Sequence, residues 1–385
     1  MKILTKTATF RAAFAAAAIT AIAAIPMAAN ADTTITLDYG GVSWDMILRG
    51  NGKANLKSCT QGTATVFDVA NIPWTFEYDH ETYTVTEIST KAFYQKNFLT
   101  GTVTLPAAIT WVGTQVFDQS TITGFSWGCT YASIPDWTFS TSTMEMPSVM
   151  LPASVTSIGR GVFAHTRITG CLIRGSASVN TYNTFNDSSP LKVVLCGPDT
   201  KGTNLTTSNN MVGGTKGCTI FAPRAGWDGF ATPGGTGTTL VLYGEGEDCD
   251  IAIDEAAKTL TATIGDGNGT GTTALQAVLD NAGRFKEYFG LDTRIAVTNT
   301  LASSVTVSGD VLQNATFVTY VTFAANTQEQ LDAILAALPA SMPIVIDATS
   351  ASKTINVPAD RNVAVLVPGG GKYGPTQKGL KIIMK

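Results

Sequence analysis

Two stretches of the sequence align residue by residue: Leu105-Pro-Ala-Ala-Ile-Thr-Trp-Val-Gly-Thr-Gln-Val-Phe117 and Leu151-Pro-Ala-Ser-Val-Thr-Ser-Ile-Gly-Arg-Gly-Val-Phe163. The same frame fits residues 85–93 and, more loosely, residues 134–139. Its last position gives a series of anchor phenylalanines, Phe93, Phe117, Phe139, Phe163 and Phe185, with Met211 as a candidate sixth anchor. This spacing predicts a repeat protein with a unit of about 23 residues.

A unit of this size cannot bury its own apolar side chains. Stacked units align equivalent residues into one continuous core, so we predict a solenoid. The anchor rings should then stack along its axis, roughly 4.8 Å apart, which is the spacing of neighbouring strands. We place Gly113 and Gly159 where the chain must turn, because glycine accepts the positive φ that turns often need.

The repeat frame resembles that of the BspA-like leucine-rich repeat family of secreted bacterial surface proteins, which reads roughly Leu-Pro-x-x-Val-Thr-x-Ile-Gly-x-x-Ala-Phe. Residues 105–117 and 151–163 match this frame closely, and residues 85–93 match it with Ser89 in place of glycine. The resemblance covers about residues 79–228. It implies a leucine-rich-repeat solenoid and a role in secreted or surface binding, often adhesion.

The first 31 residues have the pattern of a secretory signal peptide. A basic start is followed by an apolar run over residues 12–24 and by a small-x-small sequence that ends at Ala31. We expect cleavage after Ala31 and a protein that is secreted, extracellular or at the cell surface. The apolar run is shorter than the ~20 residues that span a bilayer, so no stable transmembrane segment is expected in the mature chain.

The rest of the chain divides into four parts, and the fold class is mainly β. Residues 32–78 hold short alternating runs and are predicted to cap the first repeat, since an open solenoid end would expose its core. The repeats occupy residues 79–228. Residues 229–250 read as a Gly-rich linker, and residues 251–385 read as a smaller C-terminal α+β domain.

Three patterns support that C-terminal domain. Residues 251–264 hold two strand-like runs around a turn, as in a hairpin. Apolar residues recur at helical spacing over residues 274–285. A second helix is predicted to start at Thr327, with a capping box, and to end before Pro339.

The composition excludes several functional classes. Charged residues make up 14% of the chain and the net charge is −4, whereas a nucleic-acid binder needs a basic stripe. Two histidines are too few for a multi-histidine metal centre, and an apolar fraction of 44% argues against disorder. We expect no cofactor and no metal.

One segment imitates an active site. Residues 124–128 match the Gly-x-Ser-x-Gly nucleophile elbow around Ser126, and Asp136 and His165 follow in the order that α/β-hydrolases use. An elbow needs a strand before it and a helix directly after it. Here the pentapeptide lies in the strand position of a repeat, and no helical pattern follows, so we predict that the protein is not an enzyme.

Two other polar segments are weaker candidates for a site. Residues 266–271 resemble the start of a calcium loop but lack an acidic residue at the twelfth position, where Ala277 stands. Residues 77–81 carry metal-capable side chains just before a strand. We read the first segment as a flexible turn and the second as a solvated turn.

The six cysteines leave two interpretations open. An even number of cysteines in a secreted chain suggests disulfides. Cys171, Cys196 and Cys218, however, recur at inward strand positions of successive repeats, where a free cysteine behaves as a small apolar residue. We favour packing over bridging for these three. The other cysteines are Cys59, Cys129 and Cys249.

The outward side of the repeat strands is the candidate binding face. It mixes hydroxyl groups, some apolar side chains and two cations, and such a face can meet a protein or a glycan. The predicted ligand contacts are Thr104, Ser126, Arg174, Lys192 and Phe221. The alternative is an ordinary solvated sheet face that is rich in threonine because threonine suits strands. A C-terminal domain packed over this face would contradict the hypothesis that the face binds a ligand.

These expectations combine into one functional prediction and two alternatives. We predict a secreted or cell-surface leucine-rich-repeat protein that mediates binding or adhesion to extracellular protein or glycan ligands. One alternative is a structural component of an envelope or extracellular matrix. The other is an enzyme that acts on extracellular polymers, for which the repeats supply few acidic or histidine residues.

Overall fold

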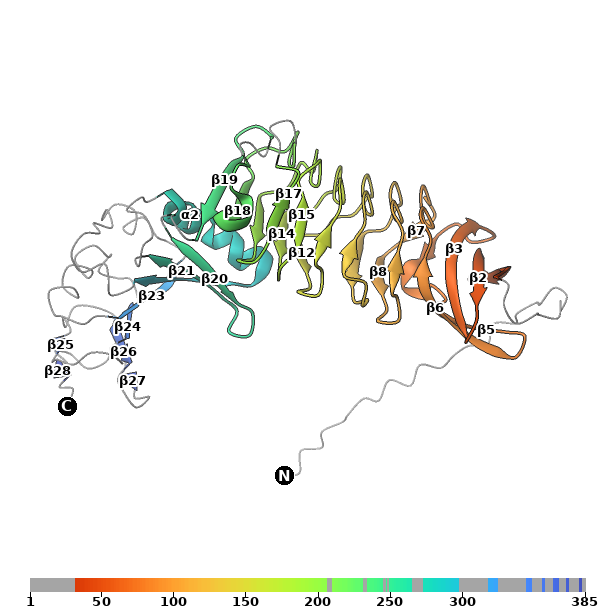
Figure 1. Ribbon diagram of the computed structural model, residues 1–385, viewed down its shortest axis with the longest axis horizontal. Helices are drawn as coiled ribbons and strands as arrows, with labels where there is room; N and C mark the ends of the chain where they lie inside the picture. The colour runs from red at the N-terminus through yellow and green to blue at the C-terminus, as the bar shows by residue number, and fades with distance from the viewer. Residues whose placement is uncertain are drawn as a thin grey trace, which may run out of the picture.

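The computed structural model describes most of the chain from residue 32 to residue 297 and short strands beyond it (Figure 1). The described ranges are 32–205, 210–230, 234–244, 247, 249–264, 273–297, 318–324, 344–347, 355–356, 363–366, 372–373 and 381–382. Three predictions lie outside them: the signal peptide over residues 1–31, the turn at 266–271 and the second helix after Thr327.

An N-terminal sheet lies at the first end of the solenoid. Its strand order is β1-β2-β3-β6-β5, with β1 (Thr33–Tyr39), β2 (Val42–Arg49), β3 (Lys53–Gln61), β5 (Thr75–Tyr78) and β6 (Glu81–Ile88). Trp44 is fully buried and meets the first anchor ring, Phe93, edge-on at 6.4 Å. Short pieces complete this end: β4 (Phe67–Asp68), the 3-10 turn η1 (Val69–Asn71) and β7 (Leu99–Thr100).

The polar segment at residues 77–81 contains a tight hairpin turn between β5 and β6. Asp79 and His80 connect β5 to β6, and both have positive φ, 49° and 63°. Two successive left-handed residues are the signature of a type I′ turn between antiparallel strands. The predicted solvated turn is confirmed.

Seven parallel strands form the main ladder of the solenoid. They are β8 (Thr102–Leu105), β10 (Gly124–Trp127), β12 (Ser148–Leu151), β14 (Gly170–Ile173), β16 (Val193–Cys196), β18 (Thr219–Pro223) and β19 (Thr239–Tyr243). The ladder is divided, because β8 and β10 make one sheet and the other five strands make a second. Strand β19 lies in the segment predicted to be a linker, so that prediction is wrong for residues 239–243: they pair with β18 and extend the solenoid.

A second set of shorter strands runs along another side of the solenoid. Strand β9 (Trp111–Val112) pairs with β6, and a four-stranded sheet follows. That sheet contains β11 (Ser133–Ile134), β13 (Ser157–Ile158), β15 (Ser178–Asn180) and β17 (Lys201–Thr203). The two strand sets enclose the apolar core between them.

The anchor phenylalanines form the predicted stack inside this core. Successive ring centroids are 4.8, 5.6, 5.8 and 5.5 Å apart from Phe93 to Phe185, and the ring planes are within 15° of each other. All five rings are fully buried. The repeat interpretation of the sequence is therefore confirmed at its anchor positions.

Each anchor lies in a tight turn that the sequence did not reveal. The residues two before and two after each Phe have positive φ; they are Lys91 and Gln95, Gln115 and Gln119, Trp137 and Thr141, Gly161 and His165, and Asn183 and Asp187. Only one of these ten is glycine. We call each repeat unit of the solenoid a rung. Hydrogen bonds between neighbouring rungs offset the strain of the left-handed residues; examples are Phe117 N–H to Thr138 O (2.8 Å) and Gln119 N–H to Ser140 O (2.9 Å).

Gly113 and Gly159 have a different role from the one predicted. Neither has positive φ. A Cβ on Gly113 would lie 2.3 Å from the Thr90 backbone nitrogen, and one on Gly159 would lie 2.6 Å from that of Asp136. Glycine is required at these positions because neighbouring rungs approach closely, not because the chain turns.

The sixth anchor position belongs to Val212 and not to Met211. In the regular rungs the anchor N–H donates to the residue before the next anchor, as Phe163 N–H does to Thr184 O. Phe185 N–H donates to Met211 O (2.7 Å), which makes Met211 the preceding residue and Val212 the anchor. The longer repeat unit after Phe185 moves the anchor position one residue beyond the predicted Met211. The side chains of Met211 and Val212 are both buried.

All six cysteines are buried, and Cys59, Cys129, Cys171, Cys196 and Cys218 are free thiols. Cys171, Cys196 and Cys218 belong to the apolar core, at the inward positions predicted for them. Burial raises the pKa of Cys59, Cys196 and Cys218 to about 12. The inward cysteines therefore act as small core residues.

These shifts predict a loss of stability in alkali. A folded-state pKa raised above the unfolded value gives stability that is present below about pH 9 and is lost as the pH rises toward 12. In that window, each thiol should lower the free energy of unfolding by up to about 1.4 kcal/mol for each unit of rise in pH. Urea unfolding at about pH 8 and about pH 10 measures the slope. The Cys196→Ala variant should lose stability less steeply, and an equal slope would contradict the assignment.

The C-terminal region contains a separate sheet of its own. Strands β20 (Asp250–Asp254) and β21 (Thr259–Ile264) form the predicted hairpin, and the predicted helix is α2 (Thr273–Phe289). The sheet continues through β22 (Asp292–Val297), β23 (Val318–Ala324), β24 (Ile344–Asp347), β26 (Val363–Leu366) and β27 (Lys372–Tyr373), and β25 (Ile355–Asn356) pairs with β28 (Lys381–Ile382).

The strand directions differ from the predicted α+β class. Strands β21, β22, β23, β24 and β26 pair in parallel, and α2 connects β21 to β22. A parallel pair needs a crossover connection, and for β21 and β22 this connection is α2, as in an α/β unit.

Candidate ligand-binding face

The outward positions of the main ladder change from polar to apolar along the solenoid. Strand register aligns the outward residues Thr104 and Ser126 in the first sheet, and Met150, Leu172, Leu195, Phe221 and Val241 in the second. The repeat places Ser126 and Met150 at equivalent positions, one before Trp127 and Leu151, so we treat the seven residues as one row. Met150 is 46% exposed, whereas Leu172 is 1% exposed and Leu195 is fully buried. The row therefore has an exposed first part and a covered second part.

Helix α2 covers the second part. It contacts β12, β14 and β19, and it lies across the ladder in Figure 1. Phe285 on the helix packs edge-on against Phe221, with ring centroids 5.2 Å apart. A Cβ on Gly170, the first outward residue of β14, would lie 3.0 Å from Tyr288 Cβ, so glycine admits the helix there.

This cover corrects part of the predicted contact set. Phe221 is fully buried under α2, so it is not available to a ligand. Arg174 forms an ion pair with Glu255 in the turn after β20 (Nε to Oε1 2.7 Å), and its side chain is 23% exposed. Lys192 is partly buried just before β16. Both cations border the covered part.

Thr104 and Ser126 remain exposed on the outward side of the first strands. We call the outward side of β8, β10 and β12 the open face, defined by Thr102, Thr104, Ser126, Ser148 and Met150. At the boundary with the covered part, Arg174 Nη2 lies 3.7 Å from Met150 Sδ. The open face is thus bounded on one side by the contacts between the solenoid and the C-terminal region.

A depression of about 290 Å³ lies on the open face, where the ladder is divided between β10 and β12. Its lining combines buried apolar side chains with two serine hydroxyl groups and two thioethers. The lining residues are Phe125, Ser126, Trp127, Met146, Ser148, Val149, Met150 and Pro152. None of these described residues ionises near neutral pH, so the depression offers packing and hydrogen bonds and no acid–base chemistry.

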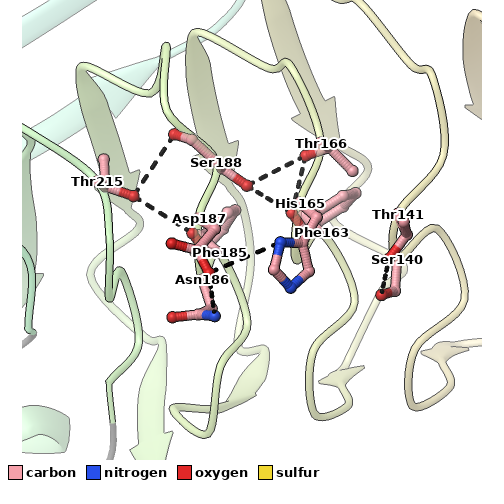
Figure 2. Close-up of polar contacts among 10 residues, drawn as sticks. All are labelled: Ser140, Thr141, Phe163, His165, Thr166, Phe185, Asn186, Asp187, Ser188 and Thr215. Atoms are coloured by element: carbon pink, nitrogen blue, oxygen red, sulfur yellow. Dashed lines mark hydrogen bonds and ion pairs between the residues drawn. The ribbon is translucent and has the colours of Figure 1, made fainter.

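The structure separates the three residues that imitate a hydrolase triad. Ser126 lies within β10 on the open face, and no helix follows that strand. His165 lies in an anchor turn, where its Nδ1 is 3.7 Å from Asp187 Oδ2 (Figure 2). The Asp136 carboxylate binds Arg160, at 2.8 Å from Nε. Asp136 and His165 therefore each have a structural partner other than Ser126.

The hydroxyl groups around His165 also have structural partners. Thr166 Oγ1 and Ser188 Oγ donate to the carbonyl oxygen of Phe163, at 2.8 and 2.6 Å (Figure 2). Ser120 and Ser142 donate in the same way to the carbonyls of Phe117 and Phe139. This buried row satisfies the anchor carbonyls.

Two further observations concern metals and membranes. Within the ranges that the structure describes, no three or more His, Cys, Asp or Glu side chains are grouped so as to hold a metal ion. Among the described helices, none is long and apolar enough to cross a bilayer.

The comparisons with known proteins identify the repeats. Residues 77–192 match the family described as BspA type leucine rich repeat region, in six copies. No curated protein matches the chain in sequence.

Matching solved structures include a leucine-rich repeat protein from Bacteroides ovatus, at 16% identity and a TM-score of 0.42, over 85% of this chain and 90% of that one. A leucine rich cell surface protein from Faecalibacterium prausnitzii matches at 14% identity and a TM-score of 0.29, over 80% and 98%. The pneumococcal vaccine antigen PcpA matches at 14% identity and a TM-score of 0.25, over 82% and 99%.

Proposed function

We propose that this chain, whose residues 77–192 form a BspA-type leucine-rich repeat region, is a secreted or surface-exposed bacterial protein that binds an extracellular polypeptide on its open face. The observation that carries the proposal is the exposure of Met150 beside a depression, in a row whose other large apolar residues are covered. An exposed apolar side chain at the rim of a hollow is typical of an interaction site.

The chemistry of the open face favours a polypeptide over a glycan. Met150 on the open face and Met146 in the lining of the depression carry thioethers, which are flexible and polarisable, and such side chains adapt to varied protein surfaces. The hydroxyl groups of the open face can bond main-chain amides. The aromatic side chains of β10, Phe125 and Trp127, are buried and present no stacking platform to a sugar.

The experiment measures binding of the chain without residues 1–31 to immobilised fibronectin, fibrinogen and collagen. We expect Met150→Asp to weaken the binding roughly tenfold or more, because a carboxylate at the rim would have to be desolvated. Asn97→Asp adds the same charge at an exposed position outside the open face and should bind like the parent chain. Binding that survives Met150→Asp would contradict the proposal, as would binding to none of the three proteins.

A further inference from the structure

A tryptophan lies flat on the outer surface of the anchor turns, away from the open face. Trp137, two residues before the anchor Phe139, has positive φ (58°). Its six-membered ring covers Gly161, the equivalent residue of the next rung: a Cβ there would lie 2.0 Å from Trp137 Cε3 and Cζ3. One face of the indole therefore rests on the backbone, and the partly exposed ring directs its other face outward.

Main-chain hydrogen bonds between rungs place Arg160 next to Trp137, and Tyr182 next to Gly161, which the indole covers. Trp137 N–H donates to Arg160 O (2.7 Å), and Gly161 N–H donates to Tyr182 O (3.0 Å). The three side chains thus come from adjacent positions on successive rungs. Tyr182 is 40% exposed, which is unusual for a large aromatic residue in this protein. We call Trp137, Arg160 and Tyr182, together with Asp136, the aromatic patch.

The charges of the aromatic patch compensate each other. Asp136 Oδ1 accepts from the Arg160 backbone N–H (2.8 Å), and Oδ2 accepts from Arg160 Nε (2.8 Å). The second oxygen also lies 2.7 Å from an Arg160 terminal nitrogen. The guanidinium is therefore fixed in place and locally neutralised, while the remaining N–H groups and oxygen lone pairs face solvent.

From this geometry we infer that the aromatic patch is a second binding site, for a neutral glycan chain. A sugar ring presents an apolar C–H face, which stacks on an indole or phenol, and a rim of hydroxyl groups, which bond to a fixed carboxylate–guanidinium pair. A neutral ligand fits because the patch offers no uncompensated charge. The inference is independent of the polypeptide site, since the two surfaces share no residue.

The test is affinity electrophoresis of the chain without residues 1–31 through gels that contain one polymer each. The neutral probes are barley β-glucan, xyloglucan, galactomannan and soluble starch; polygalacturonate and gelatin represent an acidic glycan and a protein. We expect at least one neutral glycan to retard the protein. Trp137→Ala and Tyr182→Ala should each weaken that retardation roughly tenfold, as aromatic contact residues do at binding sites.

Two controls separate binding from folding. Tyr182 is exposed, so its replacement should leave the melting temperature unchanged even if Trp137→Ala lowers it. Trp111→Ala removes another exposed tryptophan (41%) outside the patch and should not change the retardation. The inference is overturned if no neutral glycan retards the protein, if only polygalacturonate or gelatin does, or if both patch variants migrate like the parent chain.

Discussion

Replacing Phe139 by alanine is expected to destabilise the protein by about 3–5 kcal/mol. The ring is fully buried and stacks on Phe117 and Phe163, at 5.6 and 5.8 Å. Phe125 also approaches it, at 4.2 Å between ring centroids. No neighbour can collapse into the space of a lost ring without leaving its own rung, because each rung is held by hydrogen bonds to the next.

Chemical denaturation followed by circular dichroism measures this loss. Tyr94→Ala is the matched control, because it removes an aromatic ring one residue after an anchor, where the side chain is partly exposed. We expect this control to lower the free energy of unfolding by less than about 1 kcal/mol. If the two variants were equally stable, the ring stack would not be the main source of core stability.

The second large effect is expected at the contact between the solenoid and α2. Leu195→Asp places a carboxylate at a fully buried outward position, and an unpaired buried charge costs several kcal/mol. We expect α2 to leave the ladder, so that trypsin cleaves after Arg284 or Lys286 far faster than in the parent chain. The exposed apolar row should then bind the dye ANS.

Thr104→Asp is the control for this variant, because it lies in the same outward row on the open face, where the residue is exposed. We expect it to change neither the cleavage pattern nor ANS binding. Equal protection of α2 in Leu195→Asp and in the parent chain would show that the helix does not depend on this contact.

The parts of the fold that the sequence predicted are those governed by short-range periodicity. Phe93 to Phe185 recur because each must fill the same site in successive rungs, and Cys171, Cys196 and Cys218 alternate inward because strands alternate. The frame failed at Met211, where the rung is longer and Val212 takes the anchor site. A lone valine carries no signal that would separate it from any other core residue.

The covered part of the binding face was not predicted, although a signal for it exists. Leu172, Leu195 and Phe221 are apolar residues at outward strand positions, and such residues normally require a cover. The sequence does not say which element supplies it, because the contact between Phe221 and Phe285 joins positions that no local pattern connects. Strand β19 was missed for a related reason: its short apolar run, Leu240 to Tyr243, lies between glycine-rich segments that favoured a linker.

Helix α2 has a consequence for how the protein unfolds. In a simple repeat array each rung contacts only its neighbours, so the rungs can open one after another. Here one rigid helix contacts β12, β14 and β19 together, and so connects rungs that are not adjacent. We therefore expect the second half of the solenoid to open as a single cooperative unit with the helix, and the rungs of β8 and β10, which the helix contacts less, to open more independently.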